Sequence, residues 1–353
     1  MSISEKFNIE ALPKTEIHLH LEALASYESL AILNDKYKIL PEFDRIKHFE
    51  EQFNFDNLGM MIDQFLFFQT FYRDVYDYQH LLNDLEKYML DNSIYYIELY
   101  ISPTMIKKQG YVDILEFYTF LNDRIRNMAA RINGEIKIIT DVSRSFGLEN
   151  AMENLNDLYR YQQTDSNSQI IGIGLGGREK NNPASDYKTV FDRARELGLR
   201  TVAHAGEEVG SESVSEAIDI LKVSRIGHGT SLILDDELMR KVSSMQIPVE
   251  VCPTSNIVTK YYVSELSEHP IKKFIKQGLN VSVNTDDPVL FHTDLNKEYI
   301  ILFDECGLSE TEVLQIVKNG LYSTFLSDSE KDFYWSTKVE PFLKSQWHKS
   351  LIK

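Results

Sequence analysis

The sequence predicts a single (β/α)8 TIM barrel over residues 1–353, and three observations support this fold class. Eight short apolar runs have the length and composition of buried strands, and helical segments separate them in regular alternation. Such alternation implies parallel strands with right-handed crossovers, and eight strands favour a closed barrel over an open doubly wound sheet. Histidines and carboxylates follow several of these strands, which is where the active sites of such barrels lie.

The predicted elements follow one another along the whole chain. The strands span residues 15–21, 94–102, 136–143, 170–177, 199–206, 223–229, 247–255 and 279–287. The helical segments span residues 111–131, 148–161, 186–197, 213–221, 235–244, 269–276, 297–306 and 310–321. The last two segments lie beyond the eighth strand, so we expect them to be additional C-terminal helices that close the barrel.

One long excursion interrupts the alternation after the first strand. Residues 23–91 are predicted to be a helical insertion, with amphipathic stretches at 60–72 and 80–90. The stretch 60–72 is rich in methionine and aromatic residues. Packing between helices explains most of these side chains, and we expect some of them to roof an apolar pocket for a flat ligand.

Composition excludes several classes of partner. The chain has 37 Lys and Arg residues against 54 Asp and Glu residues, a net charge of −17. This charge repels phosphate backbones and anionic membranes, so we expect neither nucleic acid nor a membrane as partner. No signal peptide and no membrane span are expected from the sequence. Cys252 and Cys306 have no metal-binding spacing and are expected to be buried apolar residues, which fits a cytoplasmic protein.

The first predicted strand carries two histidines. Alternation along residues 15–21 places His18 and His20 on one face and the apolar residues on the other. A single histidine in a strand is usually structural, but imidazoles at positions i and i+2 can both reach one metal ion. We therefore interpret His18 and His20 as metal ligands.

The fifth predicted strand ends in His204, Gly206 and the carboxylates Glu207 and Glu208. Gly206 lets the chain turn, so that Glu207 is presented just beyond the strand. A histidine that can bind metal and a carboxylate that can carry a proton then lie at one rim. The alternative is a strand end with a hydrogen-bonded histidine and two solvated glutamates.

The sixth and eighth strands end in His228 and in the pair Asp286-Asp287. His228 alone can be a turn residue, and the aspartates alone can cap a helix. In a parallel barrel, however, they converge with the histidines of strands one and five. Three imidazoles and a carboxylate with one open position form a catalytic zinc site, where the pKa of bound water falls to about 7. Glu207 is then placed to carry a proton, and His228 to orient or deprotonate the water and stabilise developing negative charge.

These motifs resemble those of the adenosine deaminase family, in the family's order, from Leu12 to about Phe291. The resemblance rests on His18-Leu19-His20, Gly172-Ile173-Gly174-Leu175-Gly176-Gly177, His204-Ala205-Gly206-Glu207, Gly227-His228-Gly229, Cys252-Pro253-Thr254-Ser255-Asn256 and Asn284-Thr285-Asp286-Asp287-Pro288. It implies a purine aminohydrolase that converts a 6-aminopurine nucleoside to the 6-oxopurine and ammonia.

The resemblance also implies a role for each site residue. One Zn²⁺ per chain would be bound by three histidines and an aspartate, namely His18, His20, His204 and Asp286. Glu207 would protonate N1 of the purine, and His228 would lie beside the attacking oxygen. Asp287 would hydrogen-bond N7, and the backbone N–H of Gly177 would meet N3.

The sequence departs from the family pattern in three places. Glu22-Ala23 stands where nucleoside-acting members show Asp-Gly, so the contacts at the ribose end are expected to differ, and Glu22 is a candidate substrate-binding residue. Tyr100 stands where an arginine is common. Gly176-Gly177-Arg178-Glu179 replaces Ala-Gly-Asp-Glu of adenosine deaminases and Ser-Ser-Glu of adenine deaminases. The two glycines leave room for a sugar, and Arg178 is either a solvated charge or the partner of an anionic group on the substrate.

Several functions remain open at this point. Adenosine, a 5′-modified adenosine such as aminodeoxyfutalosine, adenine and N6-substituted nucleotides are all candidate substrates. A non-catalytic nucleoside-binding protein is the alternative class, although binding alone does not require Glu207 and His228. A cytidine-type zinc deaminase is excluded, because the Pro-Cys-x-x-Cys ligands that accompany its His-x-Glu motif are absent. The sequence carries no signal for an oligomeric state.

Overall fold

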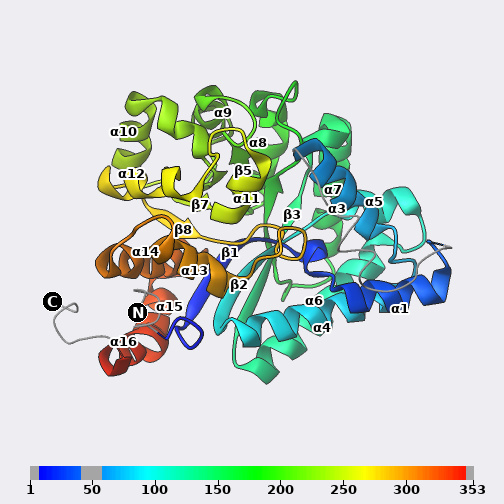
Figure 1. Ribbon diagram of the computed structural model, residues 1–353. Coiled ribbons are helices and arrows are strands. Elements are labelled where there is room, and N and C mark those ends of the chain that lie inside the picture. Colours follow the sequence, from blue (N-terminus) through cyan, green and yellow to red (C-terminus); the bar gives the residue numbers. More distant parts are fainter. Residues whose placement is uncertain (1–7, 41–57, 347–353) are drawn as a thin grey trace.

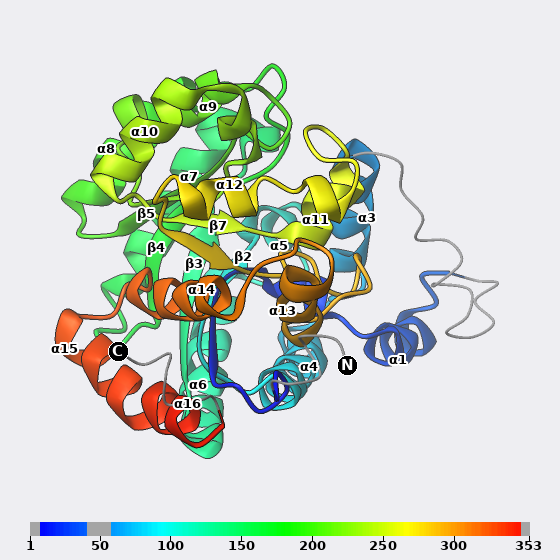
Figure 2. The same ribbon diagram turned by 60° about the vertical axis from the view of Figure 1, so that its left-hand side comes forward.

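The computed structural model describes residues 8–40 and 58–346 and confirms the predicted barrel (Figures 1 and 2). Eight strands pair in chain order, each parallel to its neighbour. They are β1 (Lys14–His20), β2 (Ile94–Ile101), β3 (Glu135–Asp141), β4 (Ile170–Leu175), β5 (Arg200–Ala205), β6 (Arg225–His228), β7 (Val249–Val251) and β8 (Val281–Val283).

The ring closes between β1 and the segment that follows β8. Leu19 and Asp286 form a parallel bridge. The N–H of Asp286 donates to the carbonyl of His18 at 3.1 Å, and the N–H of His20 donates to the carbonyl of Asp286 at 2.9 Å. This closure places Asp286 directly beside the two histidines of β1.

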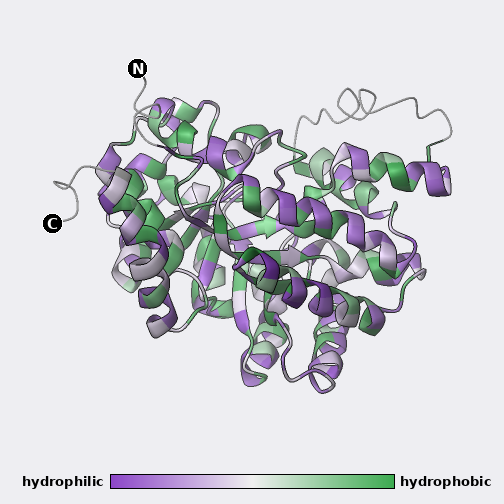
Figure 3. Ribbon diagram, turned by 90° about the horizontal axis from the view of Figure 1, so that it is seen from below, coloured by the Kyte–Doolittle hydropathy of each residue, from purple (hydrophilic) through white to green (hydrophobic). Residues whose placement is uncertain are grey.

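Helices surround the strands in both views. They are α1 (Tyr27–Tyr37), α3 (Leu58–Gln69), α4 (Tyr78–Asp91), α5 (Pro103–Gln109), α6 (Ile114–Ile132), α7 (Gly147–Gln162), α8 (Lys188–Glu196), α9 (Ser211–Glu216), α10 (Asp236–Met245), α11 (Pro253–Thr259), α12 (Ile271–Lys276), α13 (Leu295–Asp304), α14 (Glu310–Tyr322), α15 (Asp328–Tyr334) and α16 (Glu340–Gln346). Helix α6 illustrates the packing, because Phe117, Leu121 and Ile125 recur every four residues and are buried. Figure 3 shows the same mixture of hydrophobic and hydrophilic residues along the other helices.

The predicted strands after the first are all longer than the observed ones, and the seventh and eighth differ most. The prediction extended the seventh to residue 255 and the eighth to residue 287, whereas β7 ends at Val251 and β8 at Val283. Pro253 occupies the first turn of α11, where its missing N–H costs nothing. Asp286 has φ 66°, a left-handed conformation that a strand does not adopt.

The predicted insertion, residues 23–91, contains α1, α3 and α4, while its residues 41–57 lie outside the described part of the chain. Helix α3 packs against α5 and the short 3-10 helix η2 (Leu21–Leu24). Its aromatic residues divide as expected: Phe68 is buried in the core, whereas Phe65 faces His20 with ring centroids 5.6 Å apart.

Two further expectations concern the chain as a whole. Cys252 and Cys306 are both buried, with free thiols, as predicted. Among the described helices, none combines the length and apolar character that crossing a membrane requires.

Candidate active site at the carboxyl end of the barrel

A cavity of about 660 Å³, its open mouth included, lies at the carboxyl ends of the strands. That volume is within the range of small-molecule sites. The residues around it come from strand ends, from the segments that follow them, from α3 and from the first turn of α5. They are His20, Leu58, Met61, Ile62, Phe65, Leu66, Ser102, Thr104, Asp141, Ser143, Ser145, Phe146, Gly177, His204, Glu207, His228, Asp286 and Asp287.

Imidazole nitrogens and a carboxylate converge at the floor of this cavity. Nε2 of His20 lies 3.2 Å from Nε2 of His204 and 3.3 Å from Oδ1 of Asp286. Nε2 of His18 lies 3.4 Å from the same oxygen. Zinc–nitrogen distances of about 2.0–2.1 Å in a tetrahedral site place the ligand atoms about 3.3–3.4 Å apart. The spacing of these donor atoms therefore fits a single zinc-sized ion.

The contacts of His18 orient its ring so that Nε2 can bind a metal ion. Its Nδ1 contacts a carboxylate oxygen of Glu250 at 2.7 Å, which fixes the ring hydrogen on Nδ1 and leaves the lone pair of Nε2 facing the cluster. A side chain on Gly227 would prevent this arrangement, because a Cβ atom there would lie 2.8 Å from His18 Cε1. Gly227 lets β6 pass close enough to His18 for the cluster to form.

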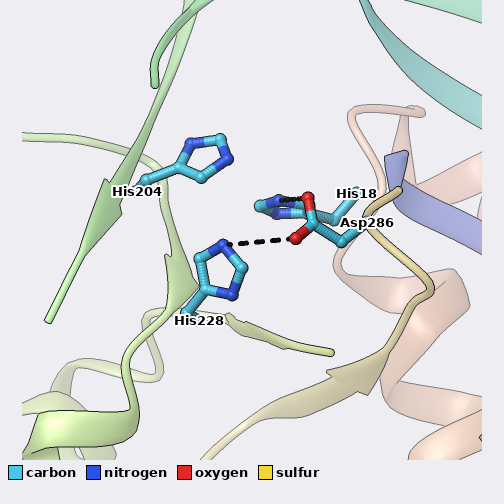
Figure 4. A group of neighbouring side chains, drawn as sticks. All are labelled: His18, His204, His228 and Asp286. Carbon is cyan, nitrogen blue, oxygen red and sulfur yellow. Dashed lines mark ion pairs between the residues drawn. The ribbon is translucent and has the colours of Figure 1, made fainter. Parts of the chain in front are cut away.

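Two groups of described residues can hold a metal ion, and they share Asp286. The first contains His18, His204, His228 and Asp286, and the second contains His20, Asp286 and Asp287. Figure 4 shows the first group, with three imidazoles around the carboxylate of Asp286. His228 stands slightly apart, since its Nε2 is 4.0 Å from Asp286 Oδ2 and 3.5 Å from Glu207 Oε2.

Three of the four carboxyl groups that line the cavity, those of Glu207, Asp286 and Asp287, differ in their ionisation. Burial, reinforced by Asp286, raises the pKa of Glu207 well above its usual value. Burial and Asp286 also raise the pKa of Asp287 to about 8. Burial works in the same direction on Asp286, but its contacts with His18 and His20 outweigh it and lower its pKa well below the usual value. These surroundings thus favour the ionised form of Asp286 and the protonated forms of Glu207 and Asp287.

A family model described as adenosine deaminase matches residues 13–337. The chain belongs to the adenosine deaminase family.

Individual relatives support this assignment. An aminodeoxyfutalosine deaminase of Streptomyces coelicolor is 34% identical over 324 residues, which cover 90% of this chain and 81% of that protein. An adenine deaminase of Crocosphaera subtropica is 32% identical over 327 residues, 92% of this chain and 97% of that protein. The crystal structure of an adenine deaminase from Arthrobacter aurescens superposes with a TM-score of 0.88 at 27% identity, covering 95% of this chain and all of that one.

Most residues assigned from the adenosine deaminase motifs lie together around the cavity. His18 is the exception among the proposed ligands, because it lies fully buried behind the lining residues. Gly177 lines the wall with φ 87°, and a Cβ atom there would come within 2.5 Å of Ser143 Oγ and Ser145 Oγ. Glycine at this position therefore leaves room that a side chain would remove.

Glu22 and Arg178 lie outside the cavity lining. Glu22 is buried, and its Oε1 accepts a hydrogen bond from the N–H of Ser102 at 2.7 Å. Burial raises the pKa of Glu22 to about 7. The guanidinium of Arg178 reaches α3, where it donates to the carbonyl of Gly59 at 3.1 Å and to Asp63 at 2.9 Å.

The sequence interpretation did not single out several polar residues of the site. Asp141 lines the cavity at the end of β3 and accepts a hydrogen bond from the N–H of Gly176 at 2.7 Å. The rule that found His204 and Asp286, a polar residue at a strand end, would also have found Asp141. Glu250 and His269 act behind the lining, as does Asn256, which the sequence analysis named only as part of a motif and without a role; only the structure reveals the partners of these three residues.

Proposed function

We propose that this chain is a zinc-dependent deaminase of a 5′-modified adenosine of the aminodeoxyfutalosine type, an adenosine with an aryl carboxylate in place of the 5′-hydroxyl. Family membership makes it an aminohydrolase of adenine-type compounds. The proposal adds the substrate, the metal and the residue roles. It also includes the cytoplasmic location and the absence of nucleic acid and membrane partners expected from the sequence.

The lining of the cavity combines polar and apolar side chains, and this combination is the observation that carries the substrate. Hydroxyl and carboxyl groups come from Ser102, Thr104, Asp141, Ser143 and Ser145. The apolar wall comes from Leu58, Met61, Ile62, Phe65 and Leu66 of α3, together with Phe146. Polar groups of this kind suit the hydroxyls of a sugar, and the apolar wall suits a flat aromatic substituent. A free adenine would use only part of this surface.

A cation also lies near the apolar wall. Nζ of Lys108 is 3.9 Å from the ring centroid of Phe146. An aryl carboxylate bound along this wall would bring its negative charge toward that ammonium group. Two curated relatives, at 34% and 33% identity, are named aminodeoxyfutalosine deaminases, which supports the same substrate class.

The proposed chemistry divides among the site residues. His18, His20, His204 and Asp286 would hold one Zn²⁺, and bound zinc supplies a water that ionises near neutral pH. Burial and Asp286 raise the pKa of Glu207 well above its usual value, which favours the protonated carboxyl group that can donate to N1 of the purine. Asp287, also raised, can donate to N7, which is an acceptor. The N–H of Gly177 would meet N3, and the products are the 6-oxopurine and ammonia.

Adenine is the second candidate substrate. The relatives at 32% and 31% identity are named adenine deaminases, and so is the protein in the superposed structure with a TM-score of 0.88. In that case the polar wall at Asp141 and Ser143 would hold water in place of a sugar.

A panel of substrates separates these candidates. Ammonia release is measured with aminodeoxyfutalosine, adenosine and adenine under identical conditions on the zinc-loaded protein. We expect the highest kcat/KM with aminodeoxyfutalosine, a lower value with adenosine and the lowest with adenine. A preference for adenine over both nucleosides would replace the proposed substrate, and ammonia release from none of the three would favour the non-catalytic binding protein.

A further inference from the structure

A buried hydrogen-bond chain runs from a backbone amide to His228. The N–H of Ile271 donates to Nδ1 of His269 at 3.2 Å. Nε2 of His269 lies 3.2 Å from Oδ1 of Asn256, and Nδ2 of Asn256 lies 3.2 Å from Nδ1 of His228. All three side chains are at most 5% exposed, so the groups bond to one another instead of to solvent.

The backbone amide sets the direction of every bond in this chain. An N–H can only donate, so Nδ1 of His269 must be the acceptor and carries no hydrogen. Burial lowers the pKa of His269 to about 3, so the ring is neutral and its one hydrogen is on Nε2. That hydrogen can only be donated to a carbonyl oxygen. The amide of Asn256 therefore turns its oxygen to His269 and its NH₂ group to His228.

The reverse orientation of the Asn256 amide is incompatible with the contacts. It would point the NH₂ group at Nε2 of His269, which would then have to accept a hydrogen bond. Nδ1 of the same ring already accepts one from Ile271. A neutral imidazole cannot accept at both nitrogens, because one of them bears hydrogen. The orientation of the amide thus follows from the partners and not from an arbitrary choice between its O and N atoms.

We infer that Asn256 and His269 are positioning residues that hold His228 as the neutral tautomer with hydrogen on Nε2. Nδ1 of His228 faces an NH₂ donor and must be a lone pair. Nε2 then bears the hydrogen and points toward the cavity, 3.5 Å from Glu207 Oε2, with no hydrogen-bond partner within the described residues. His228 presents an N–H to the attacking oxygen and stabilises its negative charge, instead of removing its proton. This role rests on the proposed function, whereas the tautomer does not.

Helix α11 contains both Asn256 and the neighbouring Ser255, and each of them contacts a residue of the site. Ser255 Oγ donates to Oδ2 of Asp286 at 2.8 Å, and Asn256 binds His228. Adjacent residues of one short helix thus orient a proposed ligand and the proposed catalytic histidine. Because Pro253 begins α11 immediately after β7, the helix is anchored to the barrel at the point where both contacts are made.

The tautomer can be observed directly by NMR on the zinc-loaded protein with ¹⁵N-labelled histidine. Long-range ¹H–¹⁵N correlations distinguish a ring nitrogen that bears hydrogen from one that does not, and a His228→Gln variant identifies the His228 signals by their loss. We expect hydrogen on Nε2 and a lone pair on Nδ1 for both His228 and His269 near neutral pH. A hydrogen on Nδ1 of His228, with or without a second one on Nε2, would overturn the inference. The spectrum is recorded without substrate, so its outcome is separate from that of the ammonia assay.

Two matched substitutions test the positioning role. Asn256→Asp replaces the NH₂ donor by an acceptor, so the hydrogen of His228 should move to Nδ1, and kcat should fall about 10²-fold with KM little changed. His269→Gln keeps an N–H donor for Oδ1 of Asn256 and should retain the tautomer and most of kcat, whereas His269→Leu should lose both. Equal losses in the Gln and Leu variants, or an unchanged tautomer in Asn256→Asp, would show that these residues act only as packing.

Discussion

Glu207 and Asp287 are carboxyl groups whose surroundings decide their chemistry. Both are nearly fully buried and lie near the ionised Asp286, and this environment raises both pKa values. A carboxylic acid that keeps its proton at neutral pH can donate a hydrogen bond or a proton to a purine nitrogen, which an ionised carboxylate cannot do. The environment of each residue, more than its identity, therefore assigns its role.

Glu207→Gln tests the proton donor. The amide keeps the shape of the side chain but cannot transfer a proton, so we expect zinc content to be retained and kcat to fall by about 10²–10⁴-fold. Glu208→Gln is the matched control, because Glu208 binds the N–H of Lys180 and the hydroxyl of Tyr261 outside the cavity. Full turnover in Glu207→Gln would rule out the proposed mechanism.

The titration of Asp287 is expected to make the reaction rate depend on pH in the alkaline range. Its pKa is raised from 3.8 to about 8, so it is protonated at neutral pH and loses its proton, and its ability to donate to N7, as the pH rises through about 8. The ratio of Asp287→Asn activity to wild-type activity should therefore increase between about pH 7 and pH 9, because the amide donates at every pH. Parallel pH–rate profiles of the two proteins would contradict this role.

At the residue scale, sequence reasoning succeeds where a polar side chain lies at the end of a strand or in the turn just beyond it. His204, Glu207, His228 and Asp286 all satisfy this rule, and the structure brings them together. The rule fails for Asn256, whose function depends on two partners that lie far away in sequence. No local pattern encodes such a contact, so the tautomer of His228 could not be inferred from the sequence.

At the scale of elements, the strands were predicted better than the short helices that follow them. Helices α5 and α11 each begin with a proline directly after a strand, at Pro103 and Pro253. The sequence interpretation assigned residues 247–255 to a single strand, although proline at the first helical position is a recognised start signal. A helix of seven residues spans only about two turns, so its hydrophobic periodicity is too short to distinguish it from a continuation of the apolar strand before it.

Helix α3 forms the apolar wall of the cavity, and Arg178 connects it to the loop after β4 through Asp63. The two side chains are 45% and 70% exposed, and such pairs contribute about 0–1 kcal/mol. We expect Arg178→Ala and Asp63→Asn each to change KM by no more than about fivefold, equally for adenosine and aminodeoxyfutalosine. A large increase in KM for aminodeoxyfutalosine but not for adenosine, seen in Arg178→Ala and not in Asp63→Asn, would show instead that Arg178 binds the carboxylate of the substrate.

Helix α13 carries a buried carboxyl group that makes stability depend on pH. Burial raises the pKa of Glu298 from 4.5 to about 7, so its contribution to stability is complete below the unfolded value of 4.5 and is lost as the pH rises through about 7. Glu298→Gln removes this titration. Relative to wild type, the variant should gain about 3 kcal/mol between about pH 4 and pH 8 in denaturant unfolding, since one pKa unit corresponds to about 1.4 kcal/mol. A constant difference between the two proteins would show that Glu298 does not titrate in this range.

At the scale of the whole molecule, buried charges connect the proposed metal site to the opposite end of the barrel. Glu250 contacts His18 and also pairs with Nε of Arg225 at 2.5 Å. Arg225 pairs in turn with Glu98 at 2.6 Å, and Glu98 accepts the N–H of Phe325 at 2.7 Å. Removing one member of such a buried set leaves an unpaired charge. A continuous set of contacts through Glu250, Arg225 and Glu98 thereby links the segment between α14 and α15 to the ring of His18.

The barrel is the feature that makes the site predictable at all. Residues as distant in sequence as His18 and Asp286 are brought together because parallel strands end at one rim, and the closure between β1 and the segment after β8 aligns them. The alternation of strands and helices was sufficient to predict this rim. The substrate side of the cavity depends also on α3. Periodicity predicted a helical stretch at residues 60–72 that roofs a pocket, but the packing of α3 against α5 and η2 is known only from the structure.

The central claim is that one zinc ion at this rim supports deamination, and a metal titration tests it most directly. The protein is stripped with a chelator, zinc is returned in steps, and bound zinc and ammonia release from aminodeoxyfutalosine are measured at each step. We predict that activity rises in proportion to bound zinc and stops rising at one ion per chain, and that His18→Ala neither retains zinc nor regains activity. Full activity in the stripped protein, or saturation with zinc without any ammonia release, would contradict the claim.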